Sequence, residues 1–151
     1  IYLLGPYMNN NVSRAVHKRK IYFMDTGLAC YLTGYNDPKT LERSLYSGAI
    51  FETYIISEII KSYTNNGKDP TKNLFFYRDK NQKEIDLIII DNGKVYPVEI
   101  KQNANPNKEA IKNFSVSKKF GMEVMNGTVL CLCKDIYAID ENNYAVPIEY
   151  I

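Results

Sequence analysis

The chain is poor in the residues that carry several common chemistries. Its single histidine, His17, excludes a histidine-based catalytic triad built within the chain and most zinc sites. The three cysteines, Cys30, Cys131 and Cys133, are odd in number and lack the paired spacing of zinc ligands, which favours a reducing cytoplasm. Metal chemistry within this chain would therefore use carboxylates, and carboxylates favour Mg²⁺ or Mn²⁺.

Other absences limit the class of protein. No run approaches the ~18 apolar residues of a membrane helix, and there is no signal-peptide pattern, so we expect no membrane association. No glycine-rich phosphate loop is present, because the sequence NGKD at residues 66–69 lacks both the earlier glycine and the following Ser or Thr. ATP binding by a parent protein would lie outside these residues. The chain begins with Ile1, and we expect it to be a piece of something longer.

The stretch KEIDLIIIDNGKVYPVEIK, residues 83–101, has the pattern of two short apolar strands joined by a tight turn. Asn92 and Gly93 both tolerate the positive φ of a two-residue hairpin loop, so the turn predicts a hairpin in which Asp91 faces Lys94. Strict alternation then predicts one apolar face packed on a core. That face would carry Ile85, Leu87, Ile89, Tyr96, Val98 and Ile100.

Charged residues lie at the far ends of both predicted strands. In the same register Asp86 faces Glu99, and Glu84 faces Lys101. Two opposed carboxylates about 5 Å apart would repel by on the order of 3 kcal/mol at an effective dielectric near 20. A divalent cation or a nearby ammonium would offset this repulsion and create a binding site. The alternative is a solvated sheet end, where Glu84 and Lys101 form an ion pair worth roughly 0.2–1 kcal/mol.

A third acid lies upstream, in a stretch with helical spacing. Residues 47–64 predict a helix that ends before the sequence NNG at residues 65–67. Projection at 100° per residue places Glu52 within the apolar stripe that includes Ile55 and Ile59, so this carboxylate points at the core. A carboxylate buried there must shift its pKa, pair with a cation or coordinate a metal. The alternative to a metal site is that Glu52 pairs with a lysine or caps a backbone group.

A helix acid, a strand acid and a Glu-x-Lys pair, in this order, resemble the PD-(D/E)XK nuclease superfamily. The chain is similar to one branch of it, the domain of unknown function that follows AAA-type ATPase domains in many bacterial and archaeal proteins. The resemblance implies an α/β fold, a restriction-endonuclease-like three-layer α-β-α core with a central mixed sheet. Four blocks carry it: KIYFMDTGLACYL (20–32), GAIFETYIISEIIK (48–61), FFYRDKNQKEIDLII (75–89) and VYPVEIK (95–101).

The resemblance also implies a set of site residues. Glu52 matches the helix acid, Asp86 the strand acid that binds metal, and Glu99 with Lys101 the Glu-x-Lys pair. On this basis Asp86, Glu99 and the main-chain carbonyl of Ile100 would hold Mg²⁺ or Mn²⁺, with Glu52 supporting it directly or through water. Lys101 would orient the attacking hydroxide or stabilise charge on the phosphorane. The implied activity is metal-dependent phosphodiester hydrolysis of nucleic acid, with DNA as the favoured substrate.

The implied organisation has two parts. Residues 1–19 would be the tail of a preceding winged-helix-like segment or a linker, and residues 20–151 the nuclease-like domain. The parent chain would carry the ATPase domain. Two other functions stay open: a catalytically silent platform that binds nucleic acid or protein for that ATPase, and a structural or oligomer-forming role in which the charges are incidental.

Candidate nucleic-acid contacts come from local clustering, because the net charge is only +2. The sequence KRK at residues 18–20 is a basic cluster, and Lys108 and Lys112 share one face if residues 105–120 form a continuous helix. Arg78, at a strand end beside the acidic residues, would contact a phosphate. The alternatives are an ordinary solvated helix face and an ion pair between Arg78 and a neighbouring acid.

The remaining patterns predict short elements on either side of the site. Asp25 or Thr26 has the position of a helix cap, and Asp37 has that of a second, followed by a proline at the first helical position. The expected additional strands are residues 21–23, 74–78, 129–133, 137–139 and 144–148.

Overall fold

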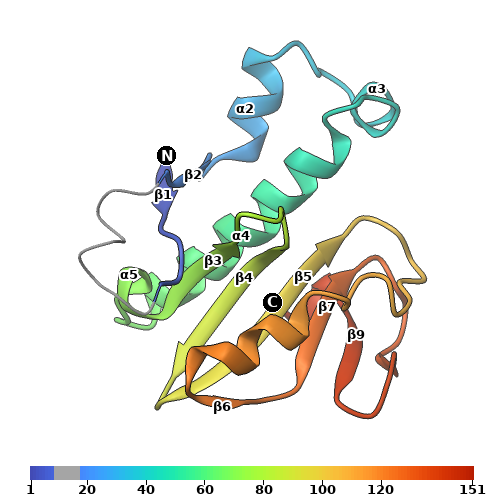
Figure 1. Cartoon of the computed structure of the whole chain (residues 1–151). Helices are drawn as coiled ribbons and strands as arrows, with labels where there is room; N and C mark the ends of the chain where they lie inside the picture. Colours follow the sequence, from blue (N-terminus) through green and yellow to red (C-terminus); the bar gives the residue numbers. More distant parts are fainter. Residues whose placement is uncertain (9–17) are drawn as a thin grey trace.

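A seven-stranded mixed sheet forms the centre of the fold (Figure 1). The computed structural model describes residues 1–8 and 18–151. The strands of this sheet are β3 (Leu74–Arg78), β4 (Glu84–Asp91), β5 (Lys94–Lys101), β6 (Glu123–Val124), β7 (Gly127–Cys131), β8 (Tyr137–Ala138) and β9 (Asn143–Pro147). Their order is β3-β4-β5-β7-β9-β8, with β6 pairing β5. The β5–β7 and β7–β9 pairs are parallel, whereas β3–β4, β4–β5 and β8–β9 are antiparallel.

Two of the short helices begin at a predicted aspartate cap. The Asp25 side chain accepts a hydrogen bond from the Leu28 N–H at 2.8 Å, and the Asp37 side chain accepts one from the Thr40 N–H at 3.0 Å, so both predicted caps are confirmed. The helices are α2 (Thr26–Leu32), α3 (Pro38–Glu42), α4 (Ser47–Asn65), α5 (Pro70–Asn73) and the 3₁₀ helices η1 (Phe114–Phe120) and η2 (Ile148–Tyr150). Helix α4 matches the predicted helix to within one residue.

Helical segments cover both faces of the sheet, which gives the expected three layers (Figure 1). On one face Ile56 of α4 packs in a core cluster with Leu87 and Val98. On the other face Phe114 of η1 packs in a second cluster with Val129. The mixed α/β fold is therefore confirmed, and the sheet is buried on both sides.

The segment before η1 differs from its prediction. Residues 108–113 form turns, and regular structure begins only at Phe114, as a 3₁₀ helix, instead of one α-helix over residues 105–120. The 3₁₀ helix ends at Gly121 with φ +73°, a conformation that suits glycine. Because Lys108 and Lys112 lie in these turns and not on an α-helix, the helical face predicted for them does not form.

The β4–β5 hairpin has the predicted turn and, near it, the predicted register. Asn92 and Gly93 have φ of +50° and +75°, and the pairs run from Asp91 opposite Lys94 to Leu87 opposite Val98. The ladder pairing stops there, so the predicted direct pairs of Asp86 with Glu99 and of Glu84 with Lys101 are wrong.

A β-bulge explains this departure. Strand β3 pairs Phe75 with Ile88 but Tyr77 with Ile85, so two residues of β4, Asp86 and Leu87, lie opposite one residue of β3. An extra residue turns every side chain beyond it to the other face. Ile85 accordingly packs in the η1 cluster and not in the α4 cluster that was predicted for it. Asp86 lies in the bulge itself.

The N-terminal residues pack against this domain. Strand β1 (Tyr2–Leu4) pairs with β2 (Lys20–Tyr22), and Leu4 and Tyr22 are both buried in the α4 cluster. Residues 5–7 run beside β3, since the Tyr7 N–H donates to the Phe76 carbonyl at 2.6 Å. Part of the predicted 1–19 segment, including His17, lies outside the described residues, and the domain boundary stays a prediction. Among the helices described, none is long and apolar enough to span a membrane.

Candidate functional site

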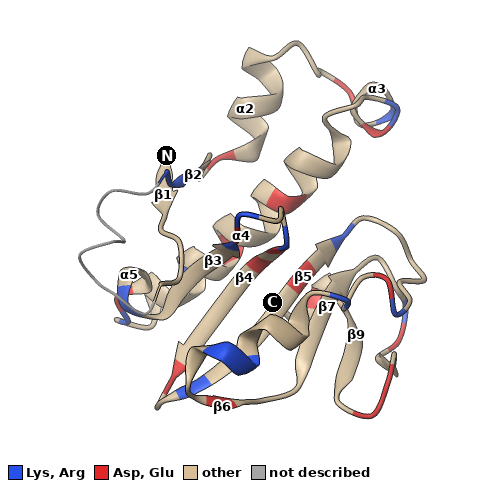
Figure 2. Cartoon of the chain, in the orientation of Figure 1, with Lys and Arg blue, Asp and Glu red and all other residues tan. Residues whose placement is uncertain are grey.

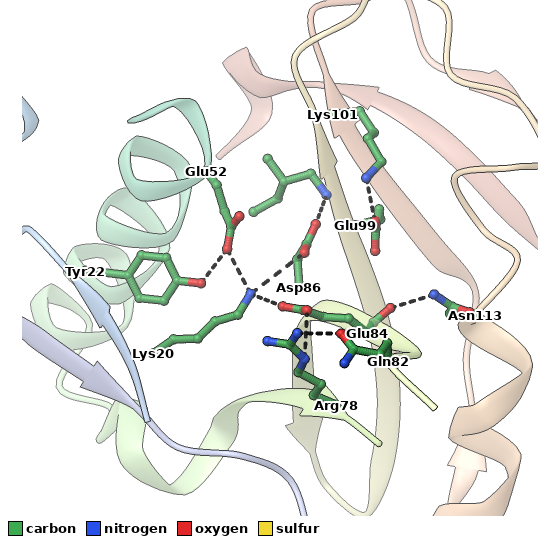
Figure 3. Close-up of polar contacts among 11 residues, drawn as sticks. Lys20, Tyr22, Glu52, Arg78, Gln82, Glu84, Asp86, Glu99, Lys101 and Asn113 are labelled. Atoms are coloured by element: carbon green, nitrogen blue, oxygen red, sulfur yellow. Dashed lines mark hydrogen bonds and ion pairs between the residues drawn. The ribbon is translucent and has the colours of Figure 1, made fainter. Parts of the chain in front are cut away.

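The ammonium of Lys20 is the centre of a charged cluster between α4 and β4 (Figure 3). Its Nζ lies 3.1 Å from Oε1 of Glu52, 2.5 Å from Oε1 of Glu84 and 4.0 Å from Oδ1 of Asp86. Lys20 is the first residue of β2, and its side chain is about one-fifth exposed. Burial acts to lower the pKa of Lys20, but the neighbouring carboxylates outweigh it and the pKa is raised. The lysine is therefore held as a cation.

Glu52 lies on α4 where the helical projection placed it, and its partners come from β2. It accepts hydrogen bonds from Nζ of Lys20 at 3.1 Å and from the Tyr22 hydroxyl at 2.5 Å. Burial and the charge of Glu52 raise the pKa of Tyr22, so this hydroxyl stays a donor. The alternative in which Glu52 pairs with a lysine is the arrangement found.

Asp86 projects from the bulge of β4 toward β5. Its Oδ2 accepts a hydrogen bond at 2.9 Å from the N–H of Ile100 (Figure 3). Burial, together with the charges of Glu99 and Glu52, raises the pKa of Asp86 to about 7, against the lowering effects of that hydrogen bond and of Lys20. The protonated form of this carboxyl is therefore favoured to a much higher pH than is usual for an aspartate.

Glu99 and Lys101 form a second charged pair on β5. Nζ of Lys101 donates to Oε1 of Glu99 at 2.7 Å, and the other oxygen, Oε2, is buried with no hydrogen-bond partner among the described residues. Burial raises the pKa of Glu99 even though Lys101 acts to lower it. The unpaired buried oxygen is energetically costly, because a lost hydrogen bond to a charged group costs more than to a neutral one.

These two clusters are close enough to interact electrostatically. The charges of Glu99 and Glu52 both raise the pKa of Asp86, and those of Asp86 and Glu52 both act to raise the pKa of Lys101. The four residues predicted from the sequence therefore come together from α4, β4 and β5. They are divided into one group around Lys20 and one around Lys101.

The residues offer a partial fit to a divalent cation. Within residues 1–8 and 18–151, no group of three or more His, Cys, Asp or Glu side chains is arranged to hold a metal ion. Asp86 and Glu99 nevertheless supply two carboxylates with raised pKa values and one oxygen without a partner. Mg²⁺ commonly takes only one or two protein carboxylates and fills its other positions with water and substrate phosphate oxygens, so this donor set suits it.

The predicted nucleic-acid contacts lie in two different places. Arg78 ends β3 beside the Lys20 cluster, where it donates to Gln82 at 2.9 Å and lies 3.7 Å from Glu84. Lys108 and Lys112 are exposed in the turns before η1, and Lys112 pairs with Glu109. Only Arg78 is thus adjacent to the carboxylates.

Sequence reasoning missed Lys20 and Tyr22 as site residues. The basic cluster at residues 18–20 indicated a positively charged surface, but it did not indicate that Lys20 lies beside Glu52. The available signal was their spacing, because residues two apart on a strand point to the same face, so Lys20 and Tyr22 can both meet one helix acid. The alternative pair of Glu84 with Lys101 is wrong, since Lys20 and Arg78 take Glu84.

Comparison with known proteins identifies a family but no activity. A family model described as "Domain of unknown function (DUF4143)" matches residues 47–151. An uncharacterized protein of Mycobacterium tuberculosis and one of Mycobacterium bovis are each 31% identical over 104 residues, which cover 69% of this chain and 22% of theirs. The aligned region thus makes up less than a quarter of these curated relatives. No solved structure matches the chain.

Proposed function

Because the chain belongs to the DUF4143 family, whose description assigns no activity, its function has to be argued from the site, and we propose that it is a metal-dependent phosphodiesterase acting on nucleic acid. In this proposal the domain belongs to the PD-(D/E)XK superfamily, works in the cytoplasm and is carried by a longer protein with an AAA-type ATPase domain. DNA is the favoured substrate.

One observation carries the proposal: two carboxylates, the partly buried Asp86 and the buried Glu99, interact without enough positive charge around them. Asp86 has its pKa raised to about 7, and Oε2 of Glu99 has no partner among the described residues. A structural ion-pair network would be expected to satisfy both groups, because buried charges are normally paired and hydrogen-bonded. Two carboxylates that lack enough neighbouring positive charge are suitable oxygen ligands for Mg²⁺ or Mn²⁺.

Each of these residues would have its own role in hydrolysis. Asp86 and Glu99, with the main-chain carbonyl of Ile100, would hold the cation, and Glu52 would support it. A bound divalent cation would activate a water molecule and screen the phosphate. Lys101 lies 2.7 Å from Glu99, and its ammonium would stabilise the negative charge that builds up as water attacks phosphorus. The P–O bond then breaks to give a phosphate monoester and a free hydroxyl.

The test uses Lys101 and a matched lysine. We expect Lys101→Ala to abolish Mg²⁺-dependent cleavage of labelled oligonucleotides while the chain stays folded. Lys94→Ala is the control, because Lys94 lies at the other end of β5 and also pairs with a glutamate, Glu123, at 3.5 Å. Unchanged cleavage in Lys101→Ala would contradict the assignment, as would cleavage in EDTA.

A binding platform is the second candidate, and the position of Lys20 favours it. Its ammonium already lies between Glu52, Glu84 and Asp86, where a cation would otherwise be needed. Calorimetric titration with Mn²⁺ separates the two functions. A catalytic site binds the metal and loses it on Asp86→Asn, whereas a platform that uses its acids only as a network binds none.

A further inference from the structure

A groove of about 670 Å³ opens beside the Lys20 cluster. Five basic residues line it: Lys18, Arg19 and Lys20 from the chain entering β2, and Arg78 and Lys80 from the end of β3 and the turn after it. Figure 2 shows basic segments at β2 and at the turn between β3 and β4. Two segments far apart in the sequence thus form one positively charged surface.

Backbone pairing holds these two segments next to each other. The Phe76 N–H donates to the Gly5 carbonyl at 3.0 Å, and the Tyr7 N–H donates to the Phe76 carbonyl, so residues 5–7 are fixed along β3. Strand β1 in turn pairs with β2, which places the residues before β2 near β3. The groove is therefore built on regular structure, with Pro6 and Phe76 in its wall.

Its outer end carries basic side chains that no acid among the described residues neutralises. Lys18, Arg19 and Lys80 are exposed, and within the described residues no ion pair joins any of them to an acid. The one acid that lines the groove, Asp79, is engaged in the turn, where its Oδ1 accepts from the N–H groups of Asn81 at 2.8 Å and Lys83 at 3.0 Å. These cationic side chains can therefore bind a polyanion.

The inner end leads to the carboxylates. Lys20 lines the groove and also contacts Glu52 and Glu84, while Arg78 lies 3.7 Å from Glu84 (Figure 3). Positive charge therefore continues from the open surface to the edge of the site that contains Asp86. This is the direction in which a phosphate chain would have to run to bring one of its phosphates to the carboxylates.

We propose that this groove binds the phosphate backbone of a nucleic-acid strand and directs it to the site around Asp86. The proposal rests on the proposed function for the identity of the ligand, but not on catalysis. Lys18, Arg19 and Lys80 make the sequence-independent phosphate contacts. Lys20 and Arg78 form the passage to the carboxylates. The lysines before η1 play no part in it.

The experiment measures binding in EDTA, where no metal-dependent cleavage occurs. Fluorescence anisotropy with labelled single-stranded DNA, double-stranded DNA and single-stranded RNA is recorded over a range of KCl concentrations. The test variant is Lys18→Ala/Arg19→Ala/Lys80→Ala. The control is Lys39→Ala/Arg43→Ala/Lys134→Ala, which removes the same charges from exposed positions outside the groove. Circular dichroism establishes that both variants are folded.

The expected result is weaker binding in the test variant alone. Affinity for the best of the three nucleic acids should fall by roughly tenfold or more at low salt, and the slope of log K against log salt should become shallower by about two. The control should stay within about twofold of the unaltered chain, since only bulk charge has changed.

Three outcomes would overturn the proposal. They are no binding of any nucleic acid at low salt, equal losses in both variants, and displacement of the oligonucleotide by an acidic peptide as effectively as by unlabelled nucleic acid. The proposed hydrolysis is judged separately, by cleavage with Mg²⁺. A chain that binds through the groove but does not cleave would keep this inference and reject the catalytic one.

Discussion

Replacing Asp86 by Asn should make the protein more stable at alkaline pH. The pKa of this carboxyl is 3.8 in the unfolded reference and about 7 in the folded chain, so folding favours its protonated form. Below pH 4 it is protonated in both states, and its contribution to stability is fully present. Between pH 4 and pH 7 the unfolded chain releases this proton while the folded chain still holds it, so that stability falls, and the loss is complete above pH 7. Asn cannot ionise, and its side-chain oxygen can still accept from the Ile100 N–H.

The magnitude follows from the pH interval. Between pH 5 and pH 8 the unaltered chain should lose on the order of 2–3 kcal/mol relative to Asp86→Asn, because each pH unit between the two pKa values corresponds to about 1.4 kcal/mol. Urea unfolding followed by circular dichroism in EDTA measures both proteins across this range. Glu58→Gln is the control, since Glu58 forms a partly exposed pair with Lys61 on α4. Curves for Asp86→Asn and the unaltered chain that run parallel from pH 5 to pH 8 would refute the reasoning.

Two further substitutions test the packing and the charged cluster. Gly127→Ala should destabilise the fold by about 1–3 kcal/mol in urea unfolding, because the added methyl group would overlap the side chains of Phe114 and Asn143; Gly48→Ala, where a methyl group meets nothing, should not. Lys20→Met should lower stability in EDTA by about 1–3 kcal/mol, because it leaves Glu52 without its lysine. The same change should strengthen Mn²⁺ binding in calorimetry, and weaker binding would contradict the view that this ammonium competes with metal.

Local chemistry made much of this fold predictable. The two aspartate caps, the Asn92-Gly93 turn and the helix containing Glu52 each depend on residues adjacent in the sequence, and each formed where expected. The side of α4 on which Glu52 lies also followed from helical periodicity. These features need no knowledge of distant segments, which is why propensity and spacing sufficed for them.

The bulge in β4 could not be predicted in this way. Alternating residues indicate a regular strand, and nothing in EIDLIIID marks where the extra residue is inserted. The pairing of β4 with β3 decides it, together with the hydrogen bond that Asp86 accepts from Ile100, and both partners are set by tertiary structure. The wrong face for Ile85 and the wrong pairing for Glu84 follow from this single feature.

Lys20 was missed for a related reason. It lies 32 residues before Glu52, and the packing of β2 against α4, together with its pairing with β1, brings the two together. A sequence pattern can identify an acid that needs a partner, but not which of many lysines provides it. Val116 and the two serines of residues 114–120 were a local signal against one continuous α-helix, and this segment is the 3₁₀ helix η1.

The balance of charges in the site bears on both the pKa of Asp86 and the proposed binding of a divalent cation. Four carboxylates, Glu52, Glu84, Asp86 and Glu99, face two lysines and Arg78, and the arrangement is therefore short of positive charge. In the chain alone a proton on Asp86 makes up the deficit, and this effect adds to burial, which is the largest cause of its raised pKa. A divalent cation at the same place would make up the deficit instead and displace that proton, since metal ligands must be deprotonated. The urea series and the Mn²⁺ titration therefore examine one quantity, the affinity of these carboxylates for positive charge. A site whose acids were fully paired would show neither the pH-dependent difference in stability nor the binding of Mn²⁺.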